Sequence, residues 1–252
     1  MTPSLALTAL PGIPLVRPGD DISALIAAAL PRADITLQAD DVLVVTSKIV
    51  SKAEGRMIAL SSVTPGDEAQ RLAAITGKDA RIVELVLRES TEVSRAAPNV
   101  LIVRHRLGFV SANAGIDQSN AAGDDAHVLL LPADPDGAAA SLRAQLAQAT
   151  GVEVGIVISD SDGRAWRIGN IGVALGVAGL PAVRDLRGQR DLMGRVLRIS
   201  IQGYADMIAS AAGLLTGEGD EGLPVVHVRG LTAPGSGRAS DIYRPPDGDL
   251  YR

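Results

Sequence analysis

The stretch from Asp160 to Arg167 carries residue types well suited to chemistry. It reads Asp-Ser-Asp-Gly-Arg-Ala-Trp-Arg and follows an apolar run, residues 154–158, that is typical of a buried strand. Carboxylate and hydroxyl oxygens are hard ligands that suit Mg²⁺ or Mn²⁺. Arginine forks suit phosphate or carboxylate. A polar turn after a strand has the same composition, so this motif alone leaves both interpretations open.

Three further loops combine small and polar residues. Ser47 to Lys52 offers two lysines and two serines, which could hold phosphates or form an amphipathic turn. Asp117 to Asn120 could supply a metal ligand and a nucleotide contact, or form an Asx turn. Thr216 to Gly222 combines three glycines with three acids. Glycines let backbone N–H groups approach an anion, and the acids could hold its cation. A helix C-cap explains Gly217 but not the density of acids.

Composition excludes several classes of protein. The chain has 252 residues, 46% of them hydrophobic and 2% aromatic, with a net charge of −5 and no cysteine. The absence of a basic, aromatic-interleaved patch argues against nucleic-acid binding, and thiolate chemistry is excluded. No apolar run reaches the about 18 residues that a membrane span needs, and the N-terminus does not resemble a signal peptide. We therefore expect a cytoplasmic protein that binds neither membranes nor nucleic acids.

Common catalytic signatures are missing. Residues 76–79, Thr-Gly-Lys-Asp, resemble the end of a Walker A motif but lack the upstream glycine and the following Ser or Thr. There is no G-x-S-x-G elbow for a serine hydrolase. The three histidines are far apart, so we interpret each as a surface or structural residue.

The elements that must position these loops alternate irregularly along the chain. The patterns predict strands at residues 5–10, 42–45, 100–103, 107–110, 128–131, 154–158, 197–200 and 225–228. Helices are predicted at 22–30, capped by Asp20 or Asp21, at 65–95 with a break near Gly77, at 138–149 and at 204–215. The Gly- and Ala-rich run 169–179 indicates tight packing near a site. The alternation is too irregular for one doubly wound sheet, so we predict an α/β fold of the mixed α+β kind.

Taken together, the motifs resemble those of the coenzyme F420:L-glutamate ligase family, also called F420-0:γ-glutamyl ligases. The resemblance runs nearly end to end. It rests on Leu10–Pro14 with Arg17–Asp21, Val45–Gly55, Ala114–Asn120, Leu130–Asp136, Ser159–Arg167 and Thr216–Gly222. Each motif is weak by itself, but their order and spacing are specific.

The resemblance implies a GTP-dependent ligase that adds L-glutamate to the lactyl carboxylate of the deazaflavin precursor F420-0 and then adds γ-linked glutamates. The implied route passes through an acyl phosphate, which the glutamate amine attacks, and releases GDP and phosphate. Two sites for Mg²⁺ or Mn²⁺ are implied, with K⁺ as a further candidate ion. The resemblance also implies a two-lobed protomer with mixed sheets in an intertwined homodimer.

Carried over residue by residue, the family's pattern assigns roles in this chain. The implied catalytic residues are Lys52 and Asp160. The implied metal ligands are Asp117, Asp160, Ser161 and Glu218. The implied nucleotide-binding residues are Ile13, Pro14, Leu15, Val16, Ser47, Lys48, Lys52, Asn120, Thr216, Gly217, Glu218, Gly219, Asp220, Glu221, Gly222 and Leu223. Relatives often carry threonine at the position of Ser161 and glutamine at that of Glu218, where this chain adds a negative charge.

We expect residues 1–252 to form a single ligase-like domain, which could divide into two lobes, without the C-terminal flavin reductase domain of some relatives. Two alternatives stay open. One is an amide ligase of the same fold that acts on a different carboxylate. The other is a non-catalytic protein that binds a nucleotide or a deazaflavin. Retention of Asp117, Asp160 and Lys52 argues against the second alternative, because a pure binder need not keep metal ligands.

Overall fold

A five-stranded mixed sheet forms the centre of the described structure. The computed structural model describes residues 2–119, 123–232, 235–245 and 248. The strands lie in the order β1 (Ala6–Ala9), β12 (Val225–Arg229), β2 (Val42–Thr46), β8 (Gly155–Asp162) and β9 (Ile171–Ala178). β2 and β8 are parallel, and the other neighbours are antiparallel. The mixture of strand directions confirms the predicted mixed fold class.

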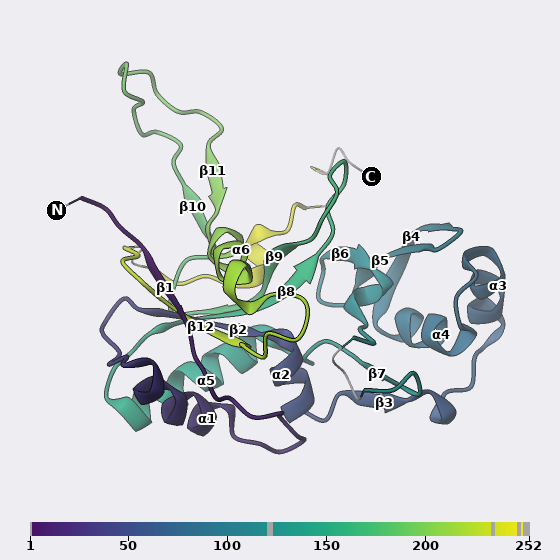
Figure 1. The fold of residues 1–252 in the computed structure, drawn as a ribbon. Coiled ribbons are helices and arrows are strands. Elements are labelled where there is room, and N and C mark those ends of the chain that lie inside the picture. The colour runs from purple at the N-terminus through teal and green to yellow at the C-terminus, as the bar shows by residue number, and fades with distance from the viewer. Residues whose placement is uncertain (1, 120–122, 233–234, 246–247, 249–252) are drawn as a thin grey trace.

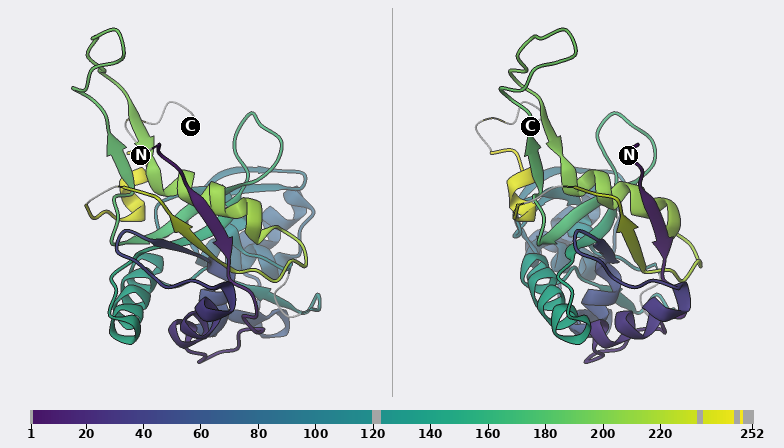
Figure 2. Two further views of the ribbon diagram at one scale, coloured as in Figure 1. Left: turned by 60° about the vertical axis from the view of Figure 1, so that its left-hand side comes forward. Right: turned by 90° about the vertical axis from the view of Figure 1, so that its left-hand side faces the viewer.

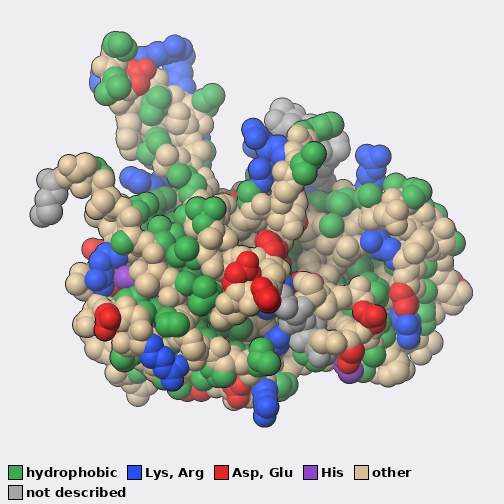
Figure 3. Space-filling view, in the orientation of Figure 1, with side chains coloured by type: hydrophobic (Ala, Val, Ile, Leu, Met, Phe, Trp, Pro, Cys, Tyr) green, Lys and Arg blue, Asp and Glu red, His purple; other side chains and the backbone are tan. Residues whose placement is uncertain are grey.

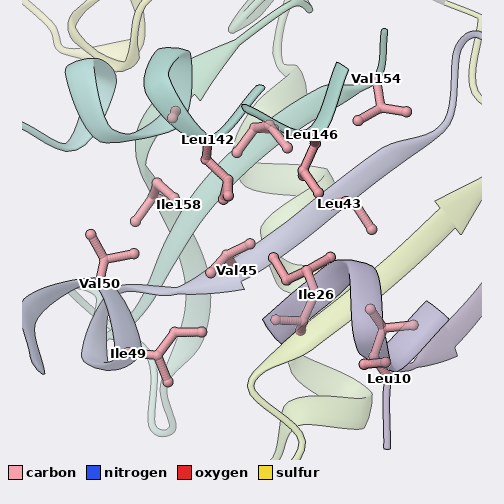
Figure 4. Close-up of a cluster of buried hydrophobic side chains, with 14 of the residues drawn as sticks. Leu10, Ile26, Leu43, Val45, Ile49, Val50, Leu142, Leu146, Val154 and Ile158 are labelled. Carbon is pink, nitrogen blue, oxygen red and sulfur yellow. The ribbon is translucent and has the colours of Figure 1, made fainter. Parts of the chain in front are cut away.

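Two-sided burial explains the continuous apolar runs of β2 and β8. Residues 42–45 and 156–158 are at most 4% exposed, as expected for strands covered on both faces. Successive side chains point to opposite faces. Leu43 and Ile158 therefore join one apolar cluster, shown in Figure 4, whereas Val44 and Val157 join the other.

Helices cover the two faces of this sheet. α1 (Ile22–Ala29) and α5 (Pro135–Thr150) pack on one face, and α6 (Tyr204–Thr216) packs on the other (Figures 1 and 2). Asp21 caps α1 as the sequence predicts, because its carboxylate accepts a hydrogen bond from the Ala24 N–H at 3.0 Å. The short helix α2 (Ser47–Ala53) begins at the residue after β2. It therefore projects its first turn from the carboxyl end of a central strand.

Residues 57–129 build two smaller sheets beside the central one (Figure 1). β3 (Met57–Ala59) pairs with β7 (His127–Leu129), and β4 (Ser90–Ala97), β5 (Val100–His105) and β6 (Val110–Ala112) form a three-stranded sheet. The helices of this region are α3 (Asp67–Thr76) and α4 (Ala80–Arg88), with 3-10 turns at Leu60–Ser62 and Asn113–Gly115. The region has apolar cores of its own, one of which centres on Leu72, Val83 and Leu101.

Three predicted elements are wrong in this part of the chain and beyond it. The strand predicted at 107–110 begins only at its last residue, because residues 107–109 form the turn between β5 and β6. The helix predicted to about Arg95 ends at Arg88, and β4 follows, because this edge strand is largely exposed and interrupted by register shifts that weaken its apolar alternation. The strand predicted at 197–200 is a loop. The pairing there is between β10 (Val183–Asp185) and β11 (Ile201–Gly203).

β10, β11 and the loop between them, residues 183–203, form an arm that projects from the body in all three views (Figures 1 and 2). Leu192, Met193 and Ile199 on this arm are at least 88% exposed. A last 3-10 turn, η4 (Ala239–Ile242), packs near β9. Within the described ranges, no helix combines the length and apolarity needed to cross a membrane.

Candidate active site

A cavity of about 600 Å³ lies at the carboxyl ends of β2 and β8. These strands are parallel and pair Thr46 with Ser159, so the polar segments that follow them meet at one edge of the sheet. The wall is completed by the loop before α1 and by the C-terminal end of α6 with the loop after it. Its lining includes Ile13, Pro14, Leu15, Val16, Lys48, Lys52, Asp160, Ser161, Thr216, Gly217, Glu218, Gly219, Asp220, Gly222 and Leu223. Most of the residues predicted from the sequence therefore line one cavity.

Three predicted residues of the described chain lie outside this lining. Ser47 and Asp117 border a neighbouring void of about 10 Å³, together with Lys48 and Asp160. Glu221 is absent from the cavity lining, because its carboxylate turns back to accept the Gly219 N–H at 2.9 Å. Asn120 lies outside the described residues.

Lys48 links the central sheet to the 57–129 region. Its ammonium forms an ion pair with the carboxylate of Asp117, which follows the 3-10 turn at Asn113–Gly115. Burial lowers the pKa of Lys48, but the hydrogen bond and charge of Asp117, with the charges of Asp160 and Glu218, raise it overall. The three acids therefore stabilise the protonated, positively charged form of the Lys48 side chain.

Asp117 is held as a carboxylate. Burial raises its pKa, but the hydrogen bond and charge of Lys48 outweigh burial and lower the pKa overall. Ser119 adds two hydrogen bonds to Oδ1, from its N–H at 2.7 Å and from its hydroxyl at 2.8 Å. This arrangement is an Asx turn. The sequence left an Asx turn and a metal ligand open as alternatives for Asp117, and the structure shows Asp117 in the turn and in the ion pair with Lys48.

Asp160 has a different electrostatic environment. Its Oδ1 accepts a hydrogen bond from Ser47 Oγ at 3.0 Å. Burial raises its pKa to about 6, because the charge of Lys48 and the hydrogen bond from Ser47 only partly offset desolvation and Asp117 adds repulsion. The positive charge around this carboxylate is therefore too small to offset its desolvation. A bound cation would supply the missing positive charge and favour the ionised form.

Ser161 and Glu218 meet although 57 residues separate them in sequence. Adjacent residues of β8 point to opposite sides, and the Ser161 hydroxyl donates to Glu218 Oε2 at 3.0 Å. Glu218 follows Gly217, whose φ of 64° lies in the left-handed region where a Cβ would also collide with Glu221. In Figure 3 acidic side chains gather over the region where α6 ends. The turn after α6 thus brings negative charge to the β8 edge of the cavity.

The oxygen donors fit hard divalent cations in type. Asp117, Asp160, Ser161 and Glu218 are all carboxylate or hydroxyl ligands, and the stabilised ammonium of Lys48 shows that their surroundings favour positive charge. Among the described residues, however, no group of three or more His, Cys, Asp or Glu side chains could hold a metal ion without rearrangement. The donors lie in two places, Asp117 with Asp160 and Ser161 with Glu218, so phosphate oxygens or water would have to complete either site.

Lys52 lines the cavity one helical turn after Lys48. Burial and repulsion by Lys48 lower its pKa, and the charge of Asp117 opposes this effect. The i, i+4 spacing places both lysines on one face of α2. That face therefore presents two positive charges toward the region of the acids.

Sequence analysis missed the small and apolar residues of the cavity wall, among them Thr46, Ile49, Met57, Gly172, Ala209 and Gly213. The Gly- and Ala-rich run 169–179 did indicate tight packing, and the structure explains it. A Cβ at Gly172 would lie 2.4 Å from the Ala209 carbonyl oxygen, so only glycine lets α6 lie this close to β9. Ala209, Gly213 and Thr216 are spaced by four and three residues, which is the signal that could have identified this helix face.

Comparisons with known proteins identify relatives of this chain. A family model described as F420-0:Gamma-glutamyl ligase matches residues 12–230. A protein of Methanopyrus kandleri named coenzyme F420:L-glutamate ligase is 44% identical over 99% of this chain and 98% of its own length. Proteins with the same name from Methanothermobacter thermautotrophicus and Archaeoglobus fulgidus are each 43% identical, over 98% and 96% of this chain and 99% and 94% of their own lengths.

Proposed function

Because this chain belongs to the F420-0:γ-glutamyl ligase family, we propose that it is a GTP-dependent ligase that adds L-glutamate to the lactyl carboxylate of F420-0 and then adds γ-linked glutamates. The relatives' shared name supports a ligase that acts on a coenzyme F420 precursor and glutamate. One observation carries the proposal for this chain. Two lysines and two acids, Lys48, Lys52, Asp160 and Glu218, line one cavity of about 600 Å³.

The cavity has the size and the lining that a nucleotide needs. Sites for small ligands and cofactors commonly measure about 300–1,000 Å³ and combine apolar walls with a few polar groups. Residues 13–16 supply an apolar wall suited to a base. The lysines of α2 supply charge suited to phosphates, and the glycines of residues 217–222 have no side chains that would keep a phosphate away from the backbone. We propose GTP as the nucleotide on the family resemblance, because nothing in this lining distinguishes guanine from another base.

The proposed chemistry proceeds in two balanced steps. An oxygen of the lactyl carboxylate attacks the γ-phosphorus of GTP, the bond to the β-phosphate oxygen breaks, and GDP leaves. The glutamate nitrogen then attacks the acyl carbon, phosphate leaves and the nitrogen loses a proton. Lys48 and Lys52 would offset the charge of the transferring group, since positioning and electrostatic stabilisation account for most catalysis of phosphoryl transfer.

Mg²⁺ or Mn²⁺, when bound, would neutralise phosphate charge, and we propose Asp117, Asp160, Ser161 and Glu218 as the protein groups that would hold the two ions, with K⁺ as a further candidate ion. Ser47 would keep the Asp160 carboxylate oriented through its 3.0 Å hydrogen bond. The ion pair of Lys48 with Asp117 would connect ligand binding to the 57–129 region.

We further propose that the 57–129 region is the second lobe of the protomer and that two protomers form an intertwined homodimer through the 183–203 arm. Support for the arm comes from Leu192 and Met193, which are fully or almost fully exposed, since large exposed apolar groups clustered on a projection are characteristic of a contact surface. Light scattering of the purified protein and of a variant lacking residues 188–198 measures the oligomeric state. A monomeric wild-type protein contradicts the proposed dimer.

Product mass tests the ligase function. The protein is incubated with F420-0, L-glutamate, GTP and Mn²⁺, and the mixture is analysed by mass spectrometry and for GDP. We expect a product heavier by one or more glutamyl residues and one GDP for each residue added, with Asp160→Asn as the inactive control. GTP hydrolysis that yields an amide only with another carboxylate would identify an amide ligase of different specificity. Binding of ligands without turnover would identify a non-catalytic protein.

A further inference from the structure

The loop that joins β8 to β9, residues 163–170, grows directly out of the cavity wall. β8 contributes residues 159–161 to that wall and β9 contributes Gly172. The two strands stay paired up to Asp162 and Ile171, so the loop begins on a paired base next to the cavity. In Figures 1 and 2 it projects from the body as the continuation of these strands. We call it the β8–β9 loop.

Trp166, the chain's only tryptophan, occupies an unusual position in this loop. Its side chain is 91% exposed and its φ is 67°. It is the third residue of a turn in which the Arg167 N–H donates to the Arg164 carbonyl at 3.4 Å. Turns with a positive φ at this position normally carry glycine or asparagine, and bulky residues are genuine outliers there. Folding of this chain does not require a tryptophan at such a site, and outliers of this kind cluster at ligand-binding segments.

Other side chains of the β8–β9 loop are exposed to solvent together with Trp166. Ile168 is fully exposed, so the loop presents a second large apolar group to solvent. Arg164 and Arg167 are exposed as well, and the structure gives them no ion pair with any described residue. A flat aromatic ring flanked by two guanidinium groups suits a ligand that is itself flat, aromatic and anionic.

The other aromatic side chains of the described residues are engaged elsewhere. Phe109 stacks on His105 with ring centroids 4.9 Å apart and lies 5.9 Å from Tyr243. Tyr204 is 6% exposed beneath Arg184. Among the Phe, Tyr and Trp rings of the described chain, Trp166 is therefore the exposed one that can stack on a ligand beside the β8–β9 loop.

We propose that the β8–β9 loop docks the deazaflavin acceptor, an inference that rests on the proposed ligase function. The ring of Trp166 stacks on the flat deazaflavin ring, while Arg164 and Arg167 bind the anionic side of the molecule. The cavity, whose lysines and acids suit a nucleotide triphosphate, has the volume expected for one ligand of that size. The acceptor ring therefore stays at the rim, and its lactyl carboxylate extends along β8 toward Lys52 and Asp160. Trp166, Arg164 and Arg167 are thus positioning residues for the acceptor.

Steady-state kinetics of Trp166→Ala tests the docking role. Stacking of a base on an aromatic side chain contributes about 1–3 kcal/mol, so we expect KM for F420-0 to rise about tenfold or more. KM for GTP and for glutamate should not change, and Trp166→Phe should restore much of the affinity. The matched control is Ile75→Ala, which truncates an exposed apolar side chain of α3. This helix contributes no residue to the cavity lining, so all three KM values should stay unchanged.

Calorimetric titration of F420-0 into each full-length protein, with light scattering of the same samples, separates the competing outcomes. The docking role predicts weaker binding of F420-0 and an unchanged oligomeric state in Trp166→Ala. An unchanged KM and affinity for F420-0 overturns the inference while the ligase function stands. A change in oligomeric state with equal loss for GTP and F420-0 also overturns it, because Trp166 would then belong to an interface between copies. Failure of the wild-type protein to glutamylate F420-0 refutes the ligase function itself.

Discussion

Two acids of this molecule, the buried Glu89 and the half-buried Asp160, show how differently one chemical group can be used. Glu89, at the end of α4, accepts hydrogen bonds from Arg56 Nη2 at 2.9 Å and Arg106 Nε at 3.0 Å. Burial raises its pKa, but the His105 imidazole 3.6 Å away, the hydrogen bond from Arg106 and the charges of the two arginines lower it to about 2. Asp160 has its pKa raised to about 6, because burial is not offset by such partners.

The difference in counter-charge distinguishes Glu89, a structural acid, from Asp160, a candidate catalytic acid. Glu89 contacts Arg56, His105 and Arg106 from two parts of the chain and is supplied with counter-charge by the fold itself. Among the described residues, no arginine or lysine forms an ion pair with Asp160. A buried carboxylate without fixed counter-charge costs stability, and such groups concentrate at functional sites, where the ligand completes the charge balance.

Asp160→Asn should have the largest effect of the variants proposed, and the effect should be on turnover rather than on stability. The amide keeps the size of the side chain but removes the charge, so we expect turnover to fall at least 100-fold, or about 3 kcal/mol of transition-state stabilisation. Thermal stability should stay the same or rise, because a poorly compensated buried charge is removed. Activity assays at saturating metal and a thermal melt measure both effects. Retention of more than a tenth of wild-type turnover would show that Asp160 is not needed for catalysis.

Glu89→Gln should show the opposite pattern. The variant leaves two arginines without their shared carboxylate, and we expect the free energy of unfolding to fall by about 2 kcal/mol, less than for a fully buried pair because both arginines are partly exposed. Activity per folded molecule should stay close to that of the wild type. Urea titrations and active-site-normalised rates test this. A large loss of turnover in a fully folded Glu89→Gln protein would make Glu89 part of the catalytic machinery.

The pH dependence of stability should sharpen the same contrast. Because the pKa of Glu89 is lower in the folded state than its ordinary value of 4.5, its contribution is fully present above that value. It is lost as pH falls toward about 2. We therefore expect the stability gap between the wild-type protein and Glu89→Gln to shrink between pH 4.5 and pH 2. Urea unfolding midpoints measured across this range decide the matter, and a constant gap would mean that Glu89 titrates normally.

Lys52→Ala should weaken GTP binding by about tenfold, since one charged contact to phosphate contributes about 1.5–3 kcal/mol at most. Lys78→Ala is the matched control, because Lys78 belongs to the incomplete Walker-like fragment and lies in the loop between α3 and α4, outside the cavity lining. Calorimetric titrations with GTP compare the two variants. Equal losses in both, or a loss in Lys78→Ala alone, would remove Lys52 from the proposed site.

The smallest expected effect concerns Glu218. Replacing this carboxylate by an amide lowers the charge available to a cation, so Glu218→Gln should keep substantial activity but need several-fold more Mg²⁺ or Mn²⁺ for half-maximal rate. The variant also keeps an acceptor for the Ser161 hydroxyl, which now donates to Glu218 at 3.0 Å. Metal titrations at saturating GTP give the comparison. Superimposable activation curves would show that no cation uses this side chain.

Local sequence patterns were sufficient to predict the strands that are buried on both faces and the N-cap of α1. Residues 42–45 and 154–158 are continuous apolar runs, and both lie in central strands that are covered on two faces. Asp21 caps α1 as expected. β4 was missed because an exposed edge strand with register shifts lacks regular apolar alternation. The loop at 197–200 was mistaken for a strand because its apolar alternation resembles that of a buried strand, whereas Ile199 is exposed on a projecting arm.

The sequence by itself determined which residue types could do chemistry at the ends of β2, β8 and α6, and the order of the motifs determined the family. Only the tertiary structure decided how those residues pair. The parallel register of β2 with β8 places Ser47 beside Asp160, and the approach of the 57–129 region places Asp117 on Lys48. Glu221 turned out to face its own loop rather than the cavity. Periodicity and capping record interactions between neighbours in the chain, whereas the pairs Ser47–Asp160 and Lys48–Asp117 join residues 113 and 69 positions apart, and only packing can bring such residues into contact.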